Sequence, residues 1–144
     1  MKTVKQVLDD KGYQVHSIAP EATVYEALEK MAEEGIGALA VLDAGELAGI
    51  VSERDYARKV VLTGRDSRET SVSDIMTRNV VCVSSNIRVD ASMSIMTEKC
   101  VRHLVVRDDG KINGMISIGD VVKAVIDDQQ FTIEQLEHYI SGHG

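Results

Sequence analysis

The sequence predicts an α/β (α+β) protein made of two tandem β-α-β-β-α repeats, packed sheet to sheet with pseudo-two-fold symmetry. The first observation is an internal repeat: shifted by 65 residues, the two halves of the 144-residue chain align without a gap over residues 16–61. The second is identity at eleven of these 46 positions, including Gly49 with Gly114 and Asp55 with Asp120. The third is that both halves show the same order of hydrophobic periods and turn residues.

Each repeat has the same expected elements. A short extended run precedes a helix whose apolar residues recur at i, i+4 and i+7. Two strands follow, joined by an Asp-x-Gly turn of the kind that connects hairpin strands, and a helix starts where the second strand ends. In the first repeat these are residues 15–18, a helix from Val24, strands 38–42 and 47–52, and a helix from Glu53. In the second they are residues 80–83, a helix from Val89, strands 103–107 and 112–117, and a helix from Gly119.

The expected domain boundary follows a polar crossover, residues 63–70. Residues 1–70 are predicted to form the first repeat with an N-terminal helix and the crossover, and residues 71–144 the second repeat with a C-terminal helix. A short helix over residues 73–76 introduces the second repeat. Thr132 and Gln135 have the spacing of a capping box, which predicts a separate terminal helix ending near Ser141 and Gly142.

Composition excludes several classes of protein. The formal net charge is -7, from 16 Lys and Arg against 23 Asp and Glu, so no nucleic-acid partner is expected. The longest apolar run, residues 36–42, is far too short to span a membrane, and no basic-then-apolar leader opens the chain. Cys82 and Cys100 lack the spacing of a disulfide framework or a zinc site and are expected to be small buried side chains. We therefore expect a cytoplasmic protein.

Catalytic motifs are absent from the sequence. It contains no nucleophile elbow, no phosphate loop and no Cys/His pair with an orienting partner. The acid that recurs in both repeats has no second reactive group that recurs with it. We expect no catalytic residues, no catalytic cofactor and no metal ligands, and predict that the protein is not an enzyme.

The ends of the two repeats carry a family resemblance. Gly49-Ile-Val-Ser52-Glu-Arg-Asp55 and Gly114-Met-Ile-Ser117-Ile-Gly-Asp120, each after an Asp-x-Gly turn, resemble the cystathionine-β-synthase (CBS) domain. The tandem arrangement resembles a CBS pair over nearly the whole chain. Residues 51–59, 64–65 and 74–77 are similar to stand-alone CBS-pair proteins of bacteria and plant organelles.

The resemblance implies a regulatory module that holds an adenosine-containing ligand in a cleft between the repeats. AMP, ADP or ATP are the expected ligands, with NADH or S-adenosylmethionine as further members of the class. It also implies a homodimer that signals in trans to an unknown regulated protein. The alternative is a structural or protein-interaction scaffold with degenerate or weak nucleotide pockets.

The recurring acids suit a nucleoside ligand. A carboxylate at a strand-to-helix turn accepts hydrogen bonds from both hydroxyls of a ribose, and Asp55 and Asp120 are the candidates. Ser52 and Ser117, three residues earlier, lie where a phosphate would meet a hydroxyl and the free N–H groups of a helix start. The alternative is a capping box, in which Ser caps the helix and the acid reaches back, and the two roles are compatible.

Cations for a phosphate differ between the repeats. Arg54 lies inside the first Ser-x-x-Asp motif, whereas Arg102 and His103 open a strand of the second repeat, where the first has only Gly37 and Ala38. These three cationic side chains are predicted to gather at one polyanion site from opposite repeats. The alternatives are solvated surface charges for the arginines and a structural role for His103.

Adenine recognition requires an apolar slot. Ile18, Ile50, Val83 and Ile116 are its expected walls, with core packing as the alternative explanation. Thr23 is expected to cap a helix, and by resemblance also to touch a sugar or phosphate. Arg88 replaces this hydroxyl in the second repeat, so the second site is expected to be altered or empty.

Overall fold

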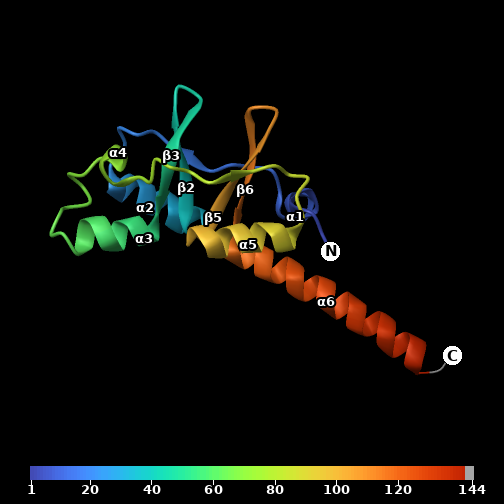
Figure 1. Cartoon of the computed structure of the whole chain (residues 1–144). Coiled ribbons are helices and arrows are strands. Elements are labelled where there is room, and N and C mark those ends of the chain that lie inside the picture. Colours follow the sequence, from blue (N-terminus) through green and yellow to red (C-terminus); the bar gives the residue numbers. More distant parts are fainter. Residues whose placement is uncertain (142–144) are drawn as a thin grey trace. The chain divides into compact units, whose positions relative to one another are not determined.

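The computed structural model describes residues 1–141 and divides into two compact units (Figure 1). One unit contains residues 14–81, and the other contains residues 1–13 together with the chain from Cys82 onward. Each unit holds one three-stranded sheet with helices, which confirms the predicted α/β class and the duplicated order of elements. The packing of one sheet against the other stays a prediction.

The unit of residues 14–81 has a sheet with the order β1-β2-β3. β1 (Ser17–Ile18) and β2 (Ala38–Asp43) are parallel and are connected through helix α2 (Val24–Glu34). β2 is antiparallel to β3 (Glu46–Ser52). The chain then forms α3 (Glu53–Tyr56), the π-helical segment η1 (Ala57–Val61) and, after the crossover, the short helix α4 (Val72–Ile75).

The other unit repeats this topology with the order β4-β5-β6. β4 (Cys82–Val83) is parallel to β5 (His103–Asp108), and helix α5 (Val89–Lys99) connects them. β5 is antiparallel to β6 (Lys111–Ser117), and the 23-residue helix α6 (Ile118–Ile140) follows. Helix α1 (Val4–Lys11) belongs to this unit as well.

The hairpin turns have the conformation that the Asp-x-Gly motif predicts. The two central residues of each turn have positive φ: 50° and 83° for Ala44 and Gly45, and 52° and 75° for Asp109 and Gly110. Two consecutive positive φ values define the turn whose twist matches that of the flanking strands, and glycine adopts the second of them without strain.

The central strand of each sheet forms the core. Residues 38–41 of β2 and 104–106 of β5 are buried on both faces, as expected when helices cover one side of a sheet and further chain covers the other. In the unit of residues 14–81 the buried cluster joins β2 to helices α2, η1 and α4 through Val24, Ala27, Met31, Leu39, Val41, Val51, Val60, Val72, Ile75 and Met76.

Each unit is completed by a segment that precedes the other repeat in the sequence. In the unit of residues 14–81, Val72 N donates to Ala22 O at 2.8 Å, just before helix α4. In the other unit, Val4 N donates to Ile87 O and Val89 N to Lys2 O, both at 2.9 Å. Helix α1 therefore packs with the second repeat and helix α4 with the first. The compact units differ in this respect from the predicted division at residues 70 and 71.

The exchanged segments explain why one glycine recurs in each repeat. A Cβ atom at Gly49 would lie 2.7 Å from Thr77 O, and one at Gly114 would lie 2.7 Å from Leu8 Cδ2. The segments after α4 and within α1 thus pass directly over the second strand of the hairpin. Only a residue without a side chain allows this close approach.

The predicted separate helix from Thr132 is wrong. Helix α6 continues unbroken through this position, and Thr132 Oγ1 donates to Asp128 O, four residues earlier, at 3.1 Å. In mid-helix a Thr hydroxyl bonds back to the preceding turn instead of capping. Helix α6 ends at Ile140, and Gly142 of the predicted end lies outside the described residues.

The expectation of buried cysteines is also wrong. Both Cys82 and Cys100 are exposed, and neither is part of a disulfide. Cys100 ends helix α5 at φ 55°, in the left-handed region, where the first repeat has Gly35 at φ 65°. A helix end places its side chain at the surface, which hydrophobicity alone does not reveal. Within residues 1–141, no helix is both long and apolar enough to cross a membrane.

Candidate functional site

The recurring Ser-x-x-Asp motif forms the same structure in both repeats. Ser52 and Ser117 are the N-caps of α3 and α6, and each hydroxyl accepts a hydrogen bond from the backbone N–H of Asp55 or Asp120. Each Asp carboxylate accepts from the N–H of its Ser in return, at 3.0 Å for Asp55 and 2.8 Å for Asp120. The capping-box interpretation is confirmed. It fixes each carboxylate at the point where a strand becomes a helix.

The Asp55 carboxylate has partners on both oxygens. Oδ2 accepts from the N–H of Ser52 at 3.0 Å and its hydroxyl at 3.1 Å. Oδ1 lies 3.1 Å from Lys59 Nζ and accepts from Thr77 Oγ1 at 3.3 Å. Lys59, one turn along the same helical segment, also donates to Ile75 O at 2.9 Å. Asp55 is therefore held by its own helix and by the segment that follows α4.

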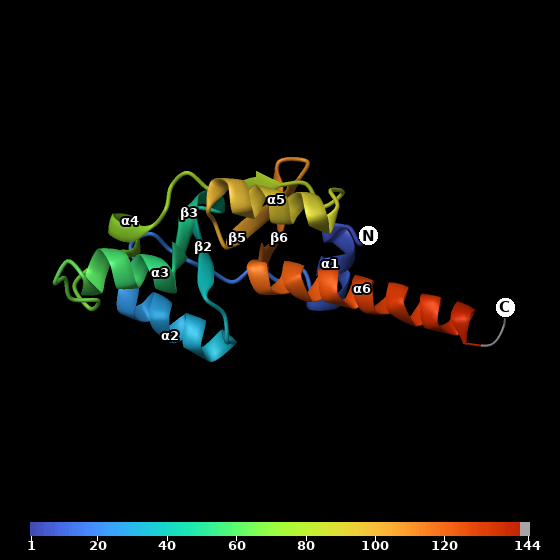
Figure 2. The same cartoon turned by 60° about the horizontal axis from the view of Figure 1, so that its bottom comes forward.

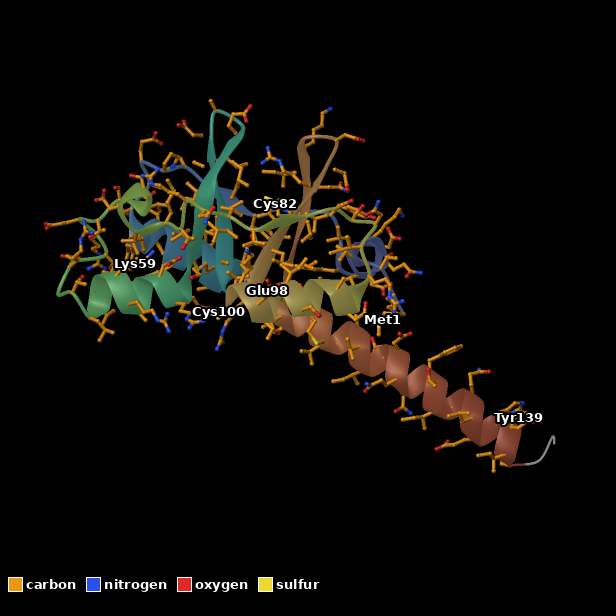
Figure 3. All side chains as sticks on the ribbon, in the orientation of Figure 1. Met1, Lys59, Cys82, Glu98, Cys100 and Tyr139 are labelled. Atoms are coloured by element: carbon orange, nitrogen blue, oxygen red, sulfur yellow. The ribbon has the colours of Figure 1, made fainter. Side chains whose placement is uncertain are left out.

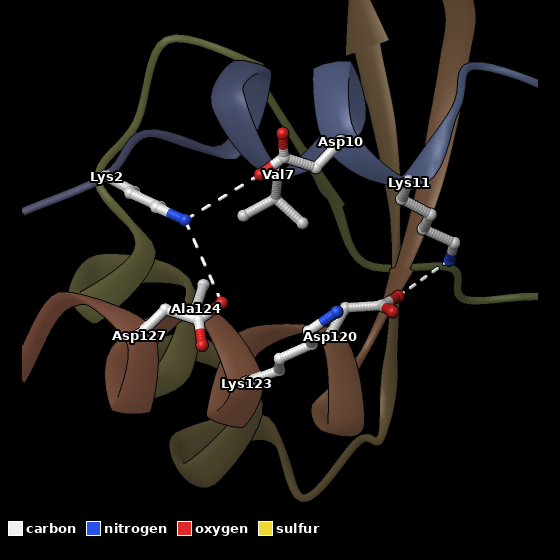
Figure 4. A pocket seen from close by; sticks show the side chains of 8 residues that line it. All are labelled: Lys2, Val7, Asp10, Lys11, Asp120, Lys123, Ala124 and Asp127. Carbon is white, nitrogen blue, oxygen red and sulfur yellow. Dashed lines mark hydrogen bonds and ion pairs between the residues drawn. The ribbon is translucent and has the colours of Figure 1, made fainter. Parts of the chain in front are cut away.

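The Asp120 carboxylate is held differently (Figure 4). Lys11, from α1, lies 2.6 Å from Asp120 Oδ2 and also donates to Met115 O at 2.8 Å. Among the described residues, the bonds to this carboxylate all fall on Oδ2. Burial by itself would raise the pKa of Asp120, but Lys11 and the Ser117 N–H outweigh it and lower that pKa below its usual 3.8. Asp120 is therefore a charged carboxylate with Oδ1 open to a further donor.

Two of the residues expected to bind phosphate, Arg102 and His103, belong to the second repeat. His103 pairs with Ser117 in the β5–β6 register, as Ala38 pairs with Ser52 in the first repeat. Burial lowers the pKa of His103, the charges of Lys11 and Arg102 lower it further, and Asp120 opposes them. His103 is half-buried and Arg102 is exposed.

Arg54 is exposed on α3, in the unit of residues 14–81. The gathering of Arg54 with Arg102 and His103, which belong to the other unit, stays a prediction.

The N-cap residues of helices α2 and α5, which precede the Ser-x-x-Asp motifs, also differ between the repeats. Thr23 caps α2, because its hydroxyl accepts from Glu26 N at 3.1 Å. Arg88, at the equivalent N-cap of α5, points its guanidinium to Asp90 in a two-bond contact of 3.1 and 2.9 Å. The predicted capping role of Thr23 is confirmed, and Arg88 replaces it with an exposed ion pair.

The four apolar residues expected to line an adenine slot are not equally accessible. Ile18 and Ile50 are half-buried, whereas Val83 is 8% exposed and Ile116 is fully buried. Core packing, the alternative weighed for these residues, accounts for Ile116. The repeat alignment explains the difference: Ile116 is equivalent to the buried Val51, and the half-buried equivalent of Ile50 is Met115. Met115 is therefore a better candidate for this wall, and the 65-residue shift itself identifies it.

A small pocket of about 100 Å³ lies between α1 and α6 beside Asp120 (Figure 4). Lys2 reaches two carboxylates across it, Asp10 at 3.7 Å and Asp127 at 4.0 Å. Charged side chains that pair with one another therefore line this pocket next to Asp120. No group of three or more His, Cys, Asp or Glu residues suited to a metal ion occurs within residues 1–141.

Both repeats therefore share the order β-α-β-β-α, with a capped carboxylate directly after the hairpin. The sequence profile of the CBS domain matches residues 4–62 and 72–127. The chain belongs to the CBS-domain family and contains two CBS domains in tandem.

Relatives and solved structures agree with this membership. A protein with CBS domains from Burkholderia ambifaria is 52% identical, with a TM-score of 0.86 over 92% of this chain and 99% of that one. The mitochondrial CBS domain-containing protein CBSX3 of Arabidopsis thaliana is 39% identical over 97% of this chain and 72% of its own length. The CBS-domain pair of protein MJ0100, solved with 5′-methylthioadenosine and S-adenosyl-L-methionine, is 22% identical, with a TM-score of 0.78 over 89% of this chain and 98% of that one. At that identity the match reflects the shared fold.

Proposed function

We propose that the chain is a regulatory module that binds an adenosine-containing ligand through the carboxylates of Asp55 and Asp120. AMP, ADP and ATP are the first candidates, and NADH and S-adenosylmethionine belong to the same class. The observation that carries the proposal is the pair of capping boxes, which hold a carboxylate at the same point of each repeat. A pre-oriented carboxylate binds a vicinal diol without reorganising, so little of the binding free energy is lost to ordering.

The second repeat offers the more open acceptor. Asp120 Oδ1 is available to a sugar hydroxyl, while Lys11 keeps the carboxylate charged and adds a positive charge next to a bound phosphate. In the first repeat a ribose has to compete with Thr77 and Lys59 for Asp55 Oδ1. We therefore propose that the Asp120 site binds more tightly, although Arg88 replaces the small hydroxyl expected there.

The ligand class has support from two sides. The MJ0100 pair binds adenosine derivatives, and this chain shares its fold. The unit that contains Asp120 also holds cations suited to phosphate: Lys11 pairs with Asp120, and the exposed Arg102 precedes His103, which pairs with Ser117 in the sheet. The further parts of the proposal are that the protein is not an enzyme, signals to another protein in trans, pairs with a second molecule and works in a reducing compartment such as the cytoplasm. Two cysteines outside any disulfide fit the last of these.

Titration calorimetry of AMP, ADP, ATP, NADH and S-adenosylmethionine, with GMP as the base control, tests the ligand class. Each adenosine ligand that binds is then compared with its 2′,3′-dideoxy analogue. Because a hydrogen bond to a charged acceptor is worth about 1.5–3 kcal/mol, losing the diol should weaken binding about 10- to 100-fold. Asp120→Asn should produce a similar loss and remove most of the discrimination between ligand and analogue.

Asp109→Asn is the matched control, because Asp109 is an exposed acid in the β5–β6 turn, outside the Ser-x-x-Asp motif, and Asn also adopts its positive φ. It should leave both affinities unchanged. If the whole panel shows no heat of binding, the proposal is wrong and the scaffold function is favoured. If ligands bind but neither Asp55→Asn nor Asp120→Asn weakens them, the ribose assignment is wrong.

A further inference from the structure

The second half of helix α6 is exposed on every side. Val121 and Ala124 are buried near the start of the helix, but all residues from 129 to 140 are exposed (Figure 2). The helix runs well past α1 and α5 of its own unit, and Tyr139 lies near its far end (Figure 3). This segment is nevertheless rich in apolar side chains.

Five apolar residues of α6, together with Gln129, follow a heptad. Positions 122, 126, 129, 133, 136 and 140 are spaced alternately by four and three residues, which is the a/d spacing of a coiled coil. We call these residues the α6 seam. Ile126, Ile133 and Ile140 occupy the a positions, and Val122, Gln129 and Leu136 the d positions.

The seam is exposed in the isolated chain. Its apolar members are 42% to 79% exposed, with Ile126 and Leu136 at 56% each and Ile140 at 79%. Burying the five apolar side chains on two molecules would remove on the order of 1,000 Å² from water, near the lower limit for a specific interface. An apolar stripe of this size on a projecting helix is typical of an interaction surface.

The identity of the seam residues selects the partner. Ile at all three a positions, with Leu136 at one of the d positions, favours two parallel helices, and such a seam is complementary to itself. A parallel in-register pair sets Gln129 against Gln129, and the two amides can bond to each other. In an antiparallel pair each d residue faces an a residue, so Gln129 lies opposite an isoleucine and its amide is buried without a partner, which is costly.

The charges of α6 are compatible with a parallel pair. Asp127, Asp128 and Glu134 lie at positions b and c, away from the seam. The flanking acid Glu137, at position e, faces the neutral Thr132 at position g of the other helix. Parallel pairing therefore brings no two acidic side chains together across the interface.

We propose that the α6 seam is an interface with a second molecule of this chain, formed as a short parallel two-stranded coiled coil. The inference deepens one part of the proposed function, the pairing with a second molecule, by assigning it a surface, and it requires no ligand. With fewer than three full heptads the dimer should be of moderate affinity, and it should dissociate on dilution.

Sedimentation equilibrium of the full chain without nucleotide tests the proposal. The wild type should be a concentration-dependent dimer. Ile133→Asp should weaken dimerisation about 100-fold or more, because it places two carboxylates at the centre of the seam. The matched control is Phe131→Asp, since Phe131 is 61% exposed but lies at position f, outside the seam. It should leave the dimer intact.

Helix orientation is tested by disulfide trapping. In a Cys82→Ser, Cys100→Ser background, Leu136→Cys should cross-link to itself, because residue 136 faces its own equivalent only in a parallel pair. Circular dichroism checks that each variant is folded, as expected for substitutions at exposed positions. A monomer at all concentrations, a dimer that survives Ile133→Asp, or a dimer that does not cross-link at residue 136 would overturn the proposal. If no nucleotide binds in the calorimetry panel, the proposed function is wrong but the α6 seam proposal is unaffected.

Discussion

Gly49→Ala tests the close approach of the exchanged segments. The added Cβ would lie 2.7 Å from Thr77 O and 2.9 Å from Met76 Sδ. Ordinary van der Waals contact begins at 3.4 Å, so the carbonyl has to move by about 0.7 Å (3.4 minus 2.7). It is not free to do so, because Ile50 and Thr77 hold each other by two backbone hydrogen bonds of 2.9 and 2.8 Å.

The expected cost follows from these contacts. Overpacking of this kind costs about 1–3 kcal/mol, and weakening one of the two backbone bonds adds about 1 kcal/mol. Alanine also restricts the unfolded chain, which offsets about 0.5 kcal/mol. The free energy of unfolding should therefore fall by about 1.5–3.5 kcal/mol. In Gly114→Ala the nearest atoms belong to the Leu8 side chain, which can change rotamer, so we expect a loss of about 1 kcal/mol.

Urea unfolding of both variants measures this difference. Gly119→Ala is the control, because a Cβ there meets only Ser117 Oγ at 3.6 Å, and it should not destabilise the protein. Hydrogen exchange should show faster exchange of the Ile50 and Thr77 amides in Gly49→Ala. Equal losses for Gly49→Ala and Gly114→Ala, or a smaller loss for Gly49→Ala, would refute the argument.

Three other perturbations concern the second repeat. Cys100→Gly should raise the free energy of unfolding by about 0.5–1 kcal/mol, because Cys100 ends α5 in the left-handed region that Gly35 occupies in the first repeat; an unchanged urea midpoint would contradict this. Burial, aided by the charge of Lys11, lowers the pKa of His103 in the folded protein below 6.5, its value in the unfolded chain. Between the folded and the unfolded pKa the unfolded chain binds more protons, so the free energy of unfolding should fall as the pH falls through this range. His103→Gln should flatten that pH dependence, and equal slopes would show that another group causes it. Lys11→Met should raise the pKa of Asp120 in a carboxyl NMR titration, and a constant pKa would exclude the ion pair as its cause.

Much of the candidate site could be predicted from the sequence, because it is local. Each capping box spans four residues, and Lys59 is four residues from Asp55, a spacing that joins side chains on a helix surface. The contact of Lys11 with Asp120 joins residues 109 positions apart, and no sequence pattern indicates it. The assignment of Ile116 failed for a different reason. Side chains alternate across a strand, so a shift of one residue from Met115 moves the choice from an accessible face to the core.

The sequence by itself determined the duplication, the order of the elements, the turns and the caps, because each depends on residues a few positions apart. Only the tertiary structure decided that α1 completes the second repeat and α4 the first, since the bonds that hold them join distant segments. It also decided that α6 continues through Thr132. A capping motif stops a helix only where the preceding residues leave helical geometry, and here the preceding turn is already helical and provides Asp128 O as the acceptor.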